Sequence, residues 1–389
     1  MKKIGLLPKL LIAIALGILF GNIAPRWFVQ LLATFNSIFG NFLGFVIPLI
    51  IIGFVAPGIG ELGNGAGKLL AITAGIAYLS TIISGSVAYF TSSMVLPNFL
   101  QVGGLVIDAA NPEESLVAPF FKVDMPPIMG VMTALLIAFT LGLGIAAIEG
   151  DSIKRFMNDF QQIIEKLISN IIIPLLPFHI LGIFANMTFA GQVATIMSVF
   201  AKVFVMIIIL HMAIIIIQYL IAGSVTGGNP FRLLKNMIPA YFTAIGTQSS
   251  AATIPVTLRQ TKLNGVDDGV AEFVVPLCAT IHLSGSTITL TSCAMAVMML
   301  NGLETSFASI FPFIMMLGVT MVAAPGVPGG AVMAALGLLE SMLGFTPTLT
   351  SLMIALYLAQ DSFGTACNVT GDGAIALVVN RISGHKLGK

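Results

Sequence analysis

Long apolar stretches follow one another along most of the chain and are separated by short polar segments. Examples are "LLIAIALGILFG", "VMTALLIAFTLGLGIAAI" and "VFVMIIILHMAIIIIQYLIAG". A helix of about 20 apolar residues is long enough to cross the ~30 Å hydrocarbon core of a bilayer. The pattern therefore predicts an all-α polytopic membrane protein that is embedded in a lipid bilayer.

Eight of the apolar stretches are regular enough to be predicted as transmembrane helices. They lie near residues 8–25, 30–57, 69–95, 128–148, 168–188, 195–222, 271–299 and 349–379.

Two further apolar stretches, 236–260 and 305–345, are less regular. Small residues and prolines interrupt them, in "GTQSSAATIP" (246–255) and in "AAPGVPGG" (323–330). Irregular backbone at membrane depth is tolerated only where protein buries it or a wet cavity solvates it. We therefore expect two re-entrant helical hairpins in addition to the eight spans.

Basic residues set the expected orientation, because cytoplasmic loops carry an excess of lysine and arginine. With the N-terminus in the cytoplasm, most basic residues lie on the cytoplasmic side and only Arg26 and Lys122 lie outside. The chain is then a multi-pass protein of the cell membrane with both termini in the cytoplasm. The two hairpins enter from opposite sides, and inverted repeats with interrupted segments are typical of secondary transporters.

Composition agrees with a membrane protein and narrows the possible partners. The chain is 57% hydrophobic and 8% charged, whereas an average soluble domain is about 25% charged. A net charge of +1 argues against nucleic acid as a partner. The three cysteines all lie in apolar stretches, so no disulfide framework is expected.

The stretch "QDSFGTACNVTGDG" (360–373) places carboxylates inside the last apolar span. Asp361, Thr365, Asn368 and Asp372 are spaced by 4, 3 and 4 residues, which puts them within roughly 60° of arc on one helix face. An aspartate at the centre of a membrane helix costs about 2.5–3.5 kcal/mol. Such groups need a cation or a proton. We expect one aspartate to bind a substrate ammonium and the other a coupling cation; the alternative is that both pair with basic side chains and fix the helix bundle.

Four segments resemble the signatures of the dicarboxylate/amino acid:cation symporter family, which includes the glutamate transporters. They read "QSSAATIPVTLR", "FVVPLCATIHLSGS", "APGVPGG" and "NVTGD", and their order and spacing also agree over nearly the whole chain. The resemblance implies a homotrimer in which part of each chain moves through the membrane as an elevator.

The resemblance also implies a division of the chain. Residues 1–222 would form mainly the scaffold and trimerisation helices, with the helices near 69–95 and 195–222 joining the transport part. Residues 223–389 would form the transport core. Its elements are expected at 236–262, 268–299, 305–345 and 349–380.

The family motifs imply a substrate site and sodium sites. In the substrate site, Asp361 would bind the amino group, while the hairpin tips would contribute backbone contacts. The substrate-binding residues implied are Ser249, Ser250, Ser286, Val327, Gly329, Asp361, Gly364, Thr365 and Asn368. Sodium would be held mostly by backbone oxygens, with Asp372 contributing its side chain; the residues implied are Cys278, Thr280, His282, Asn368 and Asp372.

Two departures from the family bear on the substrate. Members that take acidic substrates carry an arginine where this chain has Gly364, and some carry another where it has Gln248. A side-chain carboxylate would then be buried without a partner, which costs several kcal/mol. The pattern favours a small neutral amino acid and is most similar to the serine/threonine transporters of the family.

A third departure concerns the ions. The family motif Asn-Met-Asp-Gly-Thr reads "HLSGS" at 282–286, so Ser284 replaces an acid, and Ile82 replaces a hydroxyl. We therefore expect a third sodium site, which Tyr78 and Thr81 match in part, to be absent. His282 is expected either to be a hydrogen-bonded packing residue that contributes its backbone carbonyl or to carry a proton, because imidazole titrates near neutral pH.

The sequence thus predicts a Na⁺-coupled symporter of a small neutral amino acid. Proton coupling, an acidic or dicarboxylate substrate, and a channel are the alternatives. An enzyme is not expected. Asp361 and Asp372 lie too far apart on one helix to share a proton, and residues two apart on a helix, such as His282 and Ser284, do not face each other.

Overall fold

The computed structural model describes residues 6–63, 67–100, 116–148, 150–191, 193–321, 324 and 329–384, and over these ranges all of its regular structure is helical. The α-helices are α1 (Leu6–Ile23), α2 (Arg26–Gly63), α3 (Gly67–Val95), α4 (Val131–Ala147), α5 (Ser152–Leu167), α6 (Ile173–Phe189), α7 (Val193–Thr226), α8 (Pro230–Asn236), α9 (Ile238–Thr247), α10 (Ser250–Leu263), α11 (Asp268–Ile281), α12 (Ser284–Leu300), α13 (Phe307–Met321), α14 (Gly330–Leu343), α15 (Pro347–Leu358) and α16 (Asp361–Ile382). A 3₁₀ turn, η1 (Leu96–Asn98), follows α3, and a π-helical turn, η3 (Ile168–Ile172), joins α5 to α6.

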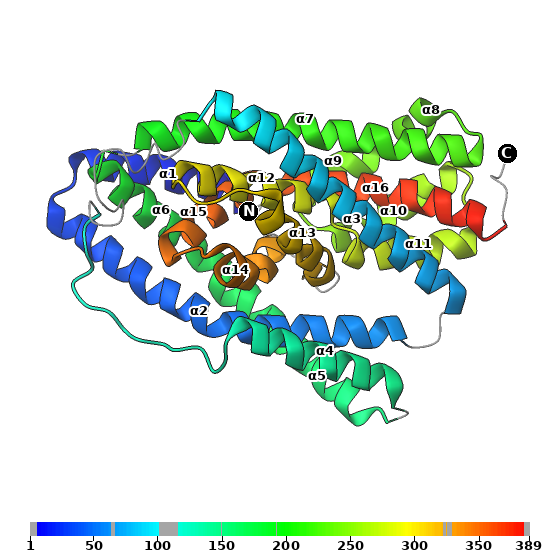
Figure 1. Ribbon diagram of the computed structural model, residues 1–389, viewed down its shortest axis with the longest axis horizontal. Coiled ribbons are helices and arrows are strands. Elements are labelled where there is room, and N and C mark those ends of the chain that lie inside the picture. The colour runs from blue at the N-terminus through cyan, green and yellow to red at the C-terminus, as the bar shows by residue number, and fades with distance from the viewer. Residues whose placement is uncertain are drawn as a thin grey trace, which may run out of the picture.

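Long helices lie side by side along the longest axis of the molecule (Figure 1). In this view α7 and α2 lie on opposite sides, and α16 lies between them. Helix α2 packs against α4, α5 and α6, whereas α16 packs against α7, α9, α11 and α12. The division into scaffold and transport core at residue 222 stays a prediction.

Five helical stretches in the described chain are long and apolar enough to cross a bilayer, judged by length and composition. They cover 26–57, 69–98, 152–189, 197–226 and 268–300. Their outer faces carry exposed large apolar side chains such as Leu79, Met94 and Ile209. An all-helical membrane protein is therefore confirmed, while the count of eight spans and two re-entrant hairpins stays a prediction.

Helix breaks fall within the segments that the sequence marks as polar. Helices α9 and α10 pack against each other and are joined at Gln248, whose φ of 54° is left-handed. Helices α13 and α14 also pack against each other, and Gly329 before α14 has a φ of +76°. Glycine adopts this region without the penalty that a Cβ imposes.

Two of the spans predicted from hydropathy each contain a short break in the helix. The span near 271–299 is divided at His282 and Leu283, and the span near 349–379 is divided between Leu358 and Asp361. Hydropathy does not reveal these breaks, because groups from other helices stabilise them. At the first break, Asn368 Oδ1 accepts hydrogen bonds from the Gly285 and Ser286 amides at 2.8 and 3.3 Å. An amide from α16 therefore caps the start of α12, whose first N–H groups have no partner within the helix.

Helices α12 and α16 meet through their backbones at this point. A Cβ added to Gly285 would lie 2.5 Å from the Gly364 carbonyl oxygen, too close for a real contact. A Cβ added to Gly364 would have its nearest neighbour, Thr289 Oγ1, at 3.5 Å, which is ordinary contact. The close approach of the two backbones therefore depends on Gly285 and not on Gly364.

We expect Gly285→Ala to lower the melting temperature of the purified protein in detergent, because overpacking costs about 1–3 kcal/mol. The matched variant Gly364→Ala should leave the melting temperature unchanged or slightly higher, since alanine is the better helix former. Equal melting temperatures for the two variants would contradict this account of the helix crossing.

Candidate functional site

Asp361 is the first residue of α16, and its side chain is buried, with 5% of the residue exposed. Its Oδ2 accepts a hydrogen bond of 2.7 Å from the Gly329 amide, which directly precedes α14. Helix N-termini carry partial positive charge and unpaired N–H groups. The carboxylate therefore lies at its own helix N-terminus and is contacted by the N-terminus of a second helix.

Asn368 and Ser286, both predicted to bind substrate, lie within hydrogen-bond distance of each other. Asn368 Nδ2 donates to Ser286 Oγ at 3.0 Å, while its oxygen caps α12. Both Asn368 and Thr365 are buried on the helix that carries Asp361. One face of α16 thus supplies a carboxylate, a hydroxyl and an amide at neighbouring turns.

The serines at the tip between α9 and α10 form a local structure of their own. Ser249 is the N-cap of α10 and accepts a hydrogen bond from the Ala252 amide at 3.2 Å, and Ser250 is buried. Helices α9 and α10, which flank this tip, both pack against α16. Val327 lies outside the described residues, so its predicted contact stays a prediction.

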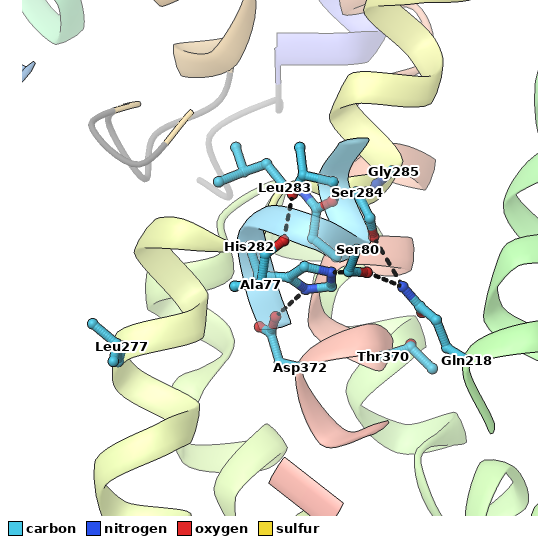
Figure 2. Close-up of polar contacts among 12 residues, drawn as sticks. Ala77, Ser80, Gln218, Leu277, His282, Leu283, Ser284, Gly285, Thr370 and Asp372 are labelled. Carbon is cyan, nitrogen blue, oxygen red and sulfur yellow. Dashed lines mark hydrogen bonds and ion pairs between the residues drawn. The ribbon is translucent and has the colours of Figure 1, made fainter. Parts of the chain in front are cut away.

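Asp372 lies deeper along α16, and its side chain is fully buried. Its Oδ1 lies 2.9 Å from Nδ1 of His282, which is also fully buried, at the break between α11 and α12 (Figure 2). Sequence reasoning gave His282 a backbone role or a proton and missed this contact between the ring and Asp372. The two residues are 90 positions apart in the chain.

The other nitrogen of His282 reaches helix α3. His282 Nε2 lies 3.0 Å from Ser80 Oγ, and Ser80 Oγ accepts a hydrogen bond of 3.1 Å from Gln218 Nε2 on α7. Gln218 Nε2 also lies 3.4 Å from Ser284 Oγ. Sequence reasoning missed Ser80 and Gln218; the only signal was a polar residue within an apolar run, such as the glutamine in "IIIIQYLIAG".

The expected sodium ligands fit a cation in part. Oδ2 of Asp372 is buried and has no hydrogen-bond partner among the described residues, and hard cations take oxygen ligands. The Cys278 carbonyl accepts the His282 amide at 2.9 Å in the last turn of α11. Thr280 is exposed and its hydroxyl donates to the Leu277 carbonyl at 2.8 Å, so any role in a sodium site would fall to its backbone.

The sequence left open that Asp361 and Asp372 pair with basic side chains and so fix the helix bundle. The structure does not support such pairs with lysine or arginine. Within the described chain, the ion pairs of lysine and arginine involve other acids, and the ion-pair partner of Asp372 is His282. The remaining buried histidines bind elsewhere. His179 contacts Asn36 and Ser351 at 3.1 and 3.0 Å, and His211 contacts the Gly285 carbonyl at 3.0 Å.

Three known proteins to which the chain is similar are membrane transporters. The model of the sodium:dicarboxylate symporter family matches residues 6–382. The serine/threonine transporter SstT of Acinetobacter baumannii (strain AYE) is 27% identical over 399 aligned residues, which cover 95% of each chain. SstT of Streptococcus suis (strain 05ZYH33) is 26% identical over 85% of this chain and 94% of its own. Excitatory amino acid transporter 1 of Bos taurus is 26% identical over 75% of this chain and 55% of its own.

Proposed function

Because the chain belongs to the sodium:dicarboxylate symporter family, we propose that it imports a small neutral amino acid, of the serine, threonine or alanine kind, together with Na⁺. Family membership confirms the resemblance seen in the four signature segments and makes the chain a membrane transporter rather than an enzyme. The proposal includes a homotrimer in the cell membrane with cytoplasmic termini and an elevator movement of residues 223–389.

One observation carries the substrate assignment: a buried carboxylate at a helix N-terminus, one turn from a position without a side chain. Asp361 supplies a negative charge for an ammonium group, and Gly364 supplies no positive charge for a second carboxylate. A zwitterion with a neutral side chain satisfies this site. The similarity to serine/threonine transporters supports the same substrate class.

The hydrogen bond between the Gly329 N–H and Asp361 suggests how the zwitterion binds. The ammonium group would replace the Gly329 N–H at Asp361, and the freed N–H would then be available to the substrate carboxylate. Anions bind well at helix N-termini, where N–H groups and the helix dipole point outward. Asp361 would thus bind the ammonium and the Gly329 N–H would bind the carboxylate of the amino acid, and these two groups are hydrogen-bonded to each other in the present structure.

Sodium would be carried with the substrate rather than kept as a cofactor. Asp372 Oδ2 would bind it, with backbone oxygens at Cys278, His282 and Asn368 nearby in the sequence motifs. A buried carboxylate without a partner costs several kcal/mol. Closure of the site over bound substrate would therefore be favoured when the cation is present.

We expect Asp361→Asn to lower the affinity for L-serine at least about 100-fold, because the buried ammonium would lose its charged partner. Isothermal titration calorimetry in saturating NaCl measures this. Asp268→Asn, which alters an exposed aspartate paired with Lys262, is the control and should bind normally. Wild-type affinity in the Asp361 variant would refute its role.

Sodium should strengthen the binding of L-serine. A titration from choline chloride to NaCl at constant ionic strength should show the apparent dissociation constant falling as sodium rises. An affinity that stays constant from zero to saturating sodium would contradict sodium coupling. Saturable uptake of labelled L-serine into liposomes would separate a carrier from a channel.

Gly364→Arg should weaken L-serine binding and confer binding of L-aspartate, because the guanidinium group would pair with the side-chain carboxylate. Space for the first atom of the side chain exists, since the nearest neighbour of a Cβ would be at 3.5 Å. Gly364→Met supplies bulk without charge and should weaken L-serine binding without conferring L-aspartate binding. Aspartate binding by both variants, or by neither, would argue against charge as the determinant.

A further inference from the structure

A chain of hydrogen bonds connects Asp372, the carboxylate proposed to bind the coupling ion, to one residue on α3 and one on α7 that the family motifs do not include in the ion site. We propose that Ser80 on α3 and Gln218 on α7 are positioning residues for cation coupling: they hold the imidazole of His282 against one oxygen of Asp372, so that the other oxygen faces the cation. This inference rests on the Na⁺ symport proposed above.

The geometry forms a continuous path. Gln218 Nε2 lies 3.1 Å from Ser80 Oγ, Ser80 Oγ lies 3.0 Å from His282 Nε2, and His282 Nδ1 lies 2.9 Å from Asp372 Oδ1. Figure 2 shows the His282 ring between Asp372 and Ser80, with Gln218 beyond Ser80. The ring is therefore held at both of its nitrogen atoms.

The hydrogen bonds in this path can all be donated in the direction from Gln218 toward Asp372. The amide of Gln218 donates to Ser80 Oγ, and the single hydroxyl proton of Ser80 is then available for His282 Nε2. When Asp372 is ionised it can only accept, so a neutral His282 ring in this path carries its proton on Nδ1 and donates it to Asp372. Other hydroxyls on α3 behave differently: those of Thr81 and Ser84 donate to backbone carbonyls one turn earlier.

Packing against α16 restricts the ring further. A Cβ added to Gly371, the residue before Asp372, would lie 2.7 Å from both His282 Cε1 and Gln218 Oε1. Both side chains thus rest directly on the backbone of α16, where only glycine leaves room. A rotation of the imidazole out of this position would break its hydrogen bonds to both Ser80 and Asp372.

The consequence for Asp372 is that its two oxygens differ. Oδ1 is occupied by His282, and Oδ2 has no partner among the described residues. Partners that orient a metal-binding group change metal affinity typically 10–100-fold when they are mutated. The distance of Ser80 and Gln218 from Asp372 therefore does not exclude a strong effect on the cation.

The experiment measures the thermal stabilisation of the full-length protein by NaCl, without amino acid, in a choline chloride background. Ser80→Ala should raise the NaCl concentration for half-maximal stabilisation about tenfold. Gln218→Met should raise it less, and Ser80→Thr, which keeps the hydroxyl, should restore the wild-type value. L-serine should bind Ser80→Ala normally once NaCl is saturating.

Ser84→Ala is the matched control. Ser84 is a second serine on α3, one turn after Ser80; it is buried, and its hydroxyl donates to the Ser80 carbonyl at 2.7 Å rather than to His282. It should leave the half-maximal NaCl concentration unchanged. If Ser80→Ala lowers the melting temperature but requires the same NaCl concentration as the wild type, the hydrogen bond is only structural and the inference is overturned.

A wild-type protein that sodium does not stabilise would overturn both the proposed sodium coupling and this inference. A wild-type response that Ser80→Ala and Gln218→Met leave unchanged would overturn this inference alone.

Discussion

Two carboxylates buried in an apolar protein are the constraint on which the rest of the structure depends. Neither has a lysine or arginine partner within the described chain, so the polypeptide satisfies them in other ways. Asp361 receives an amide from the N-terminus of α14, and Asp372 receives an imidazole from the break between α11 and α12. The amide that reaches Asp361 is free because α14 begins directly after Gly329, since the first N–H groups of a helix have no partner within it.

Helix α16 carries both aspartates and packs against the start of α12. Its Asn368 caps α12, and its Gly364 carbonyl lies against Gly285, so the two helices are fixed in both rotation and separation. The same helix positions both aspartates. A change in how α16 lies against α12 would consequently move Asp361 and Asp372 together.

The polar face of α16 could be predicted from the sequence, whereas the contacts that reach it from other helices could not. The stripe from Asp361 to Asp372 could be predicted because helical periodicity places residues spaced by three and four on one face. The break at His282 could not, because the side chain that stabilises it is that of Asn368, 83 residues after the Gly285 amide from which it accepts a hydrogen bond. Ser80 and Gln218 were missed for the same reason: Ser80 lies 202 residues before the histidine it contacts, and neither residue falls in a family motif.

The bond between Gly329 and Asp361 has a consequence for the unloaded protein. A symporter must return empty after each delivery, and a bare carboxylate would make that return costly. If Asp361 binds the substrate ammonium as proposed, the Gly329 N–H would replace that ammonium during the return. The affinity for substrate would then depend on how much more strongly an ammonium group binds the carboxylate than a single peptide N–H does.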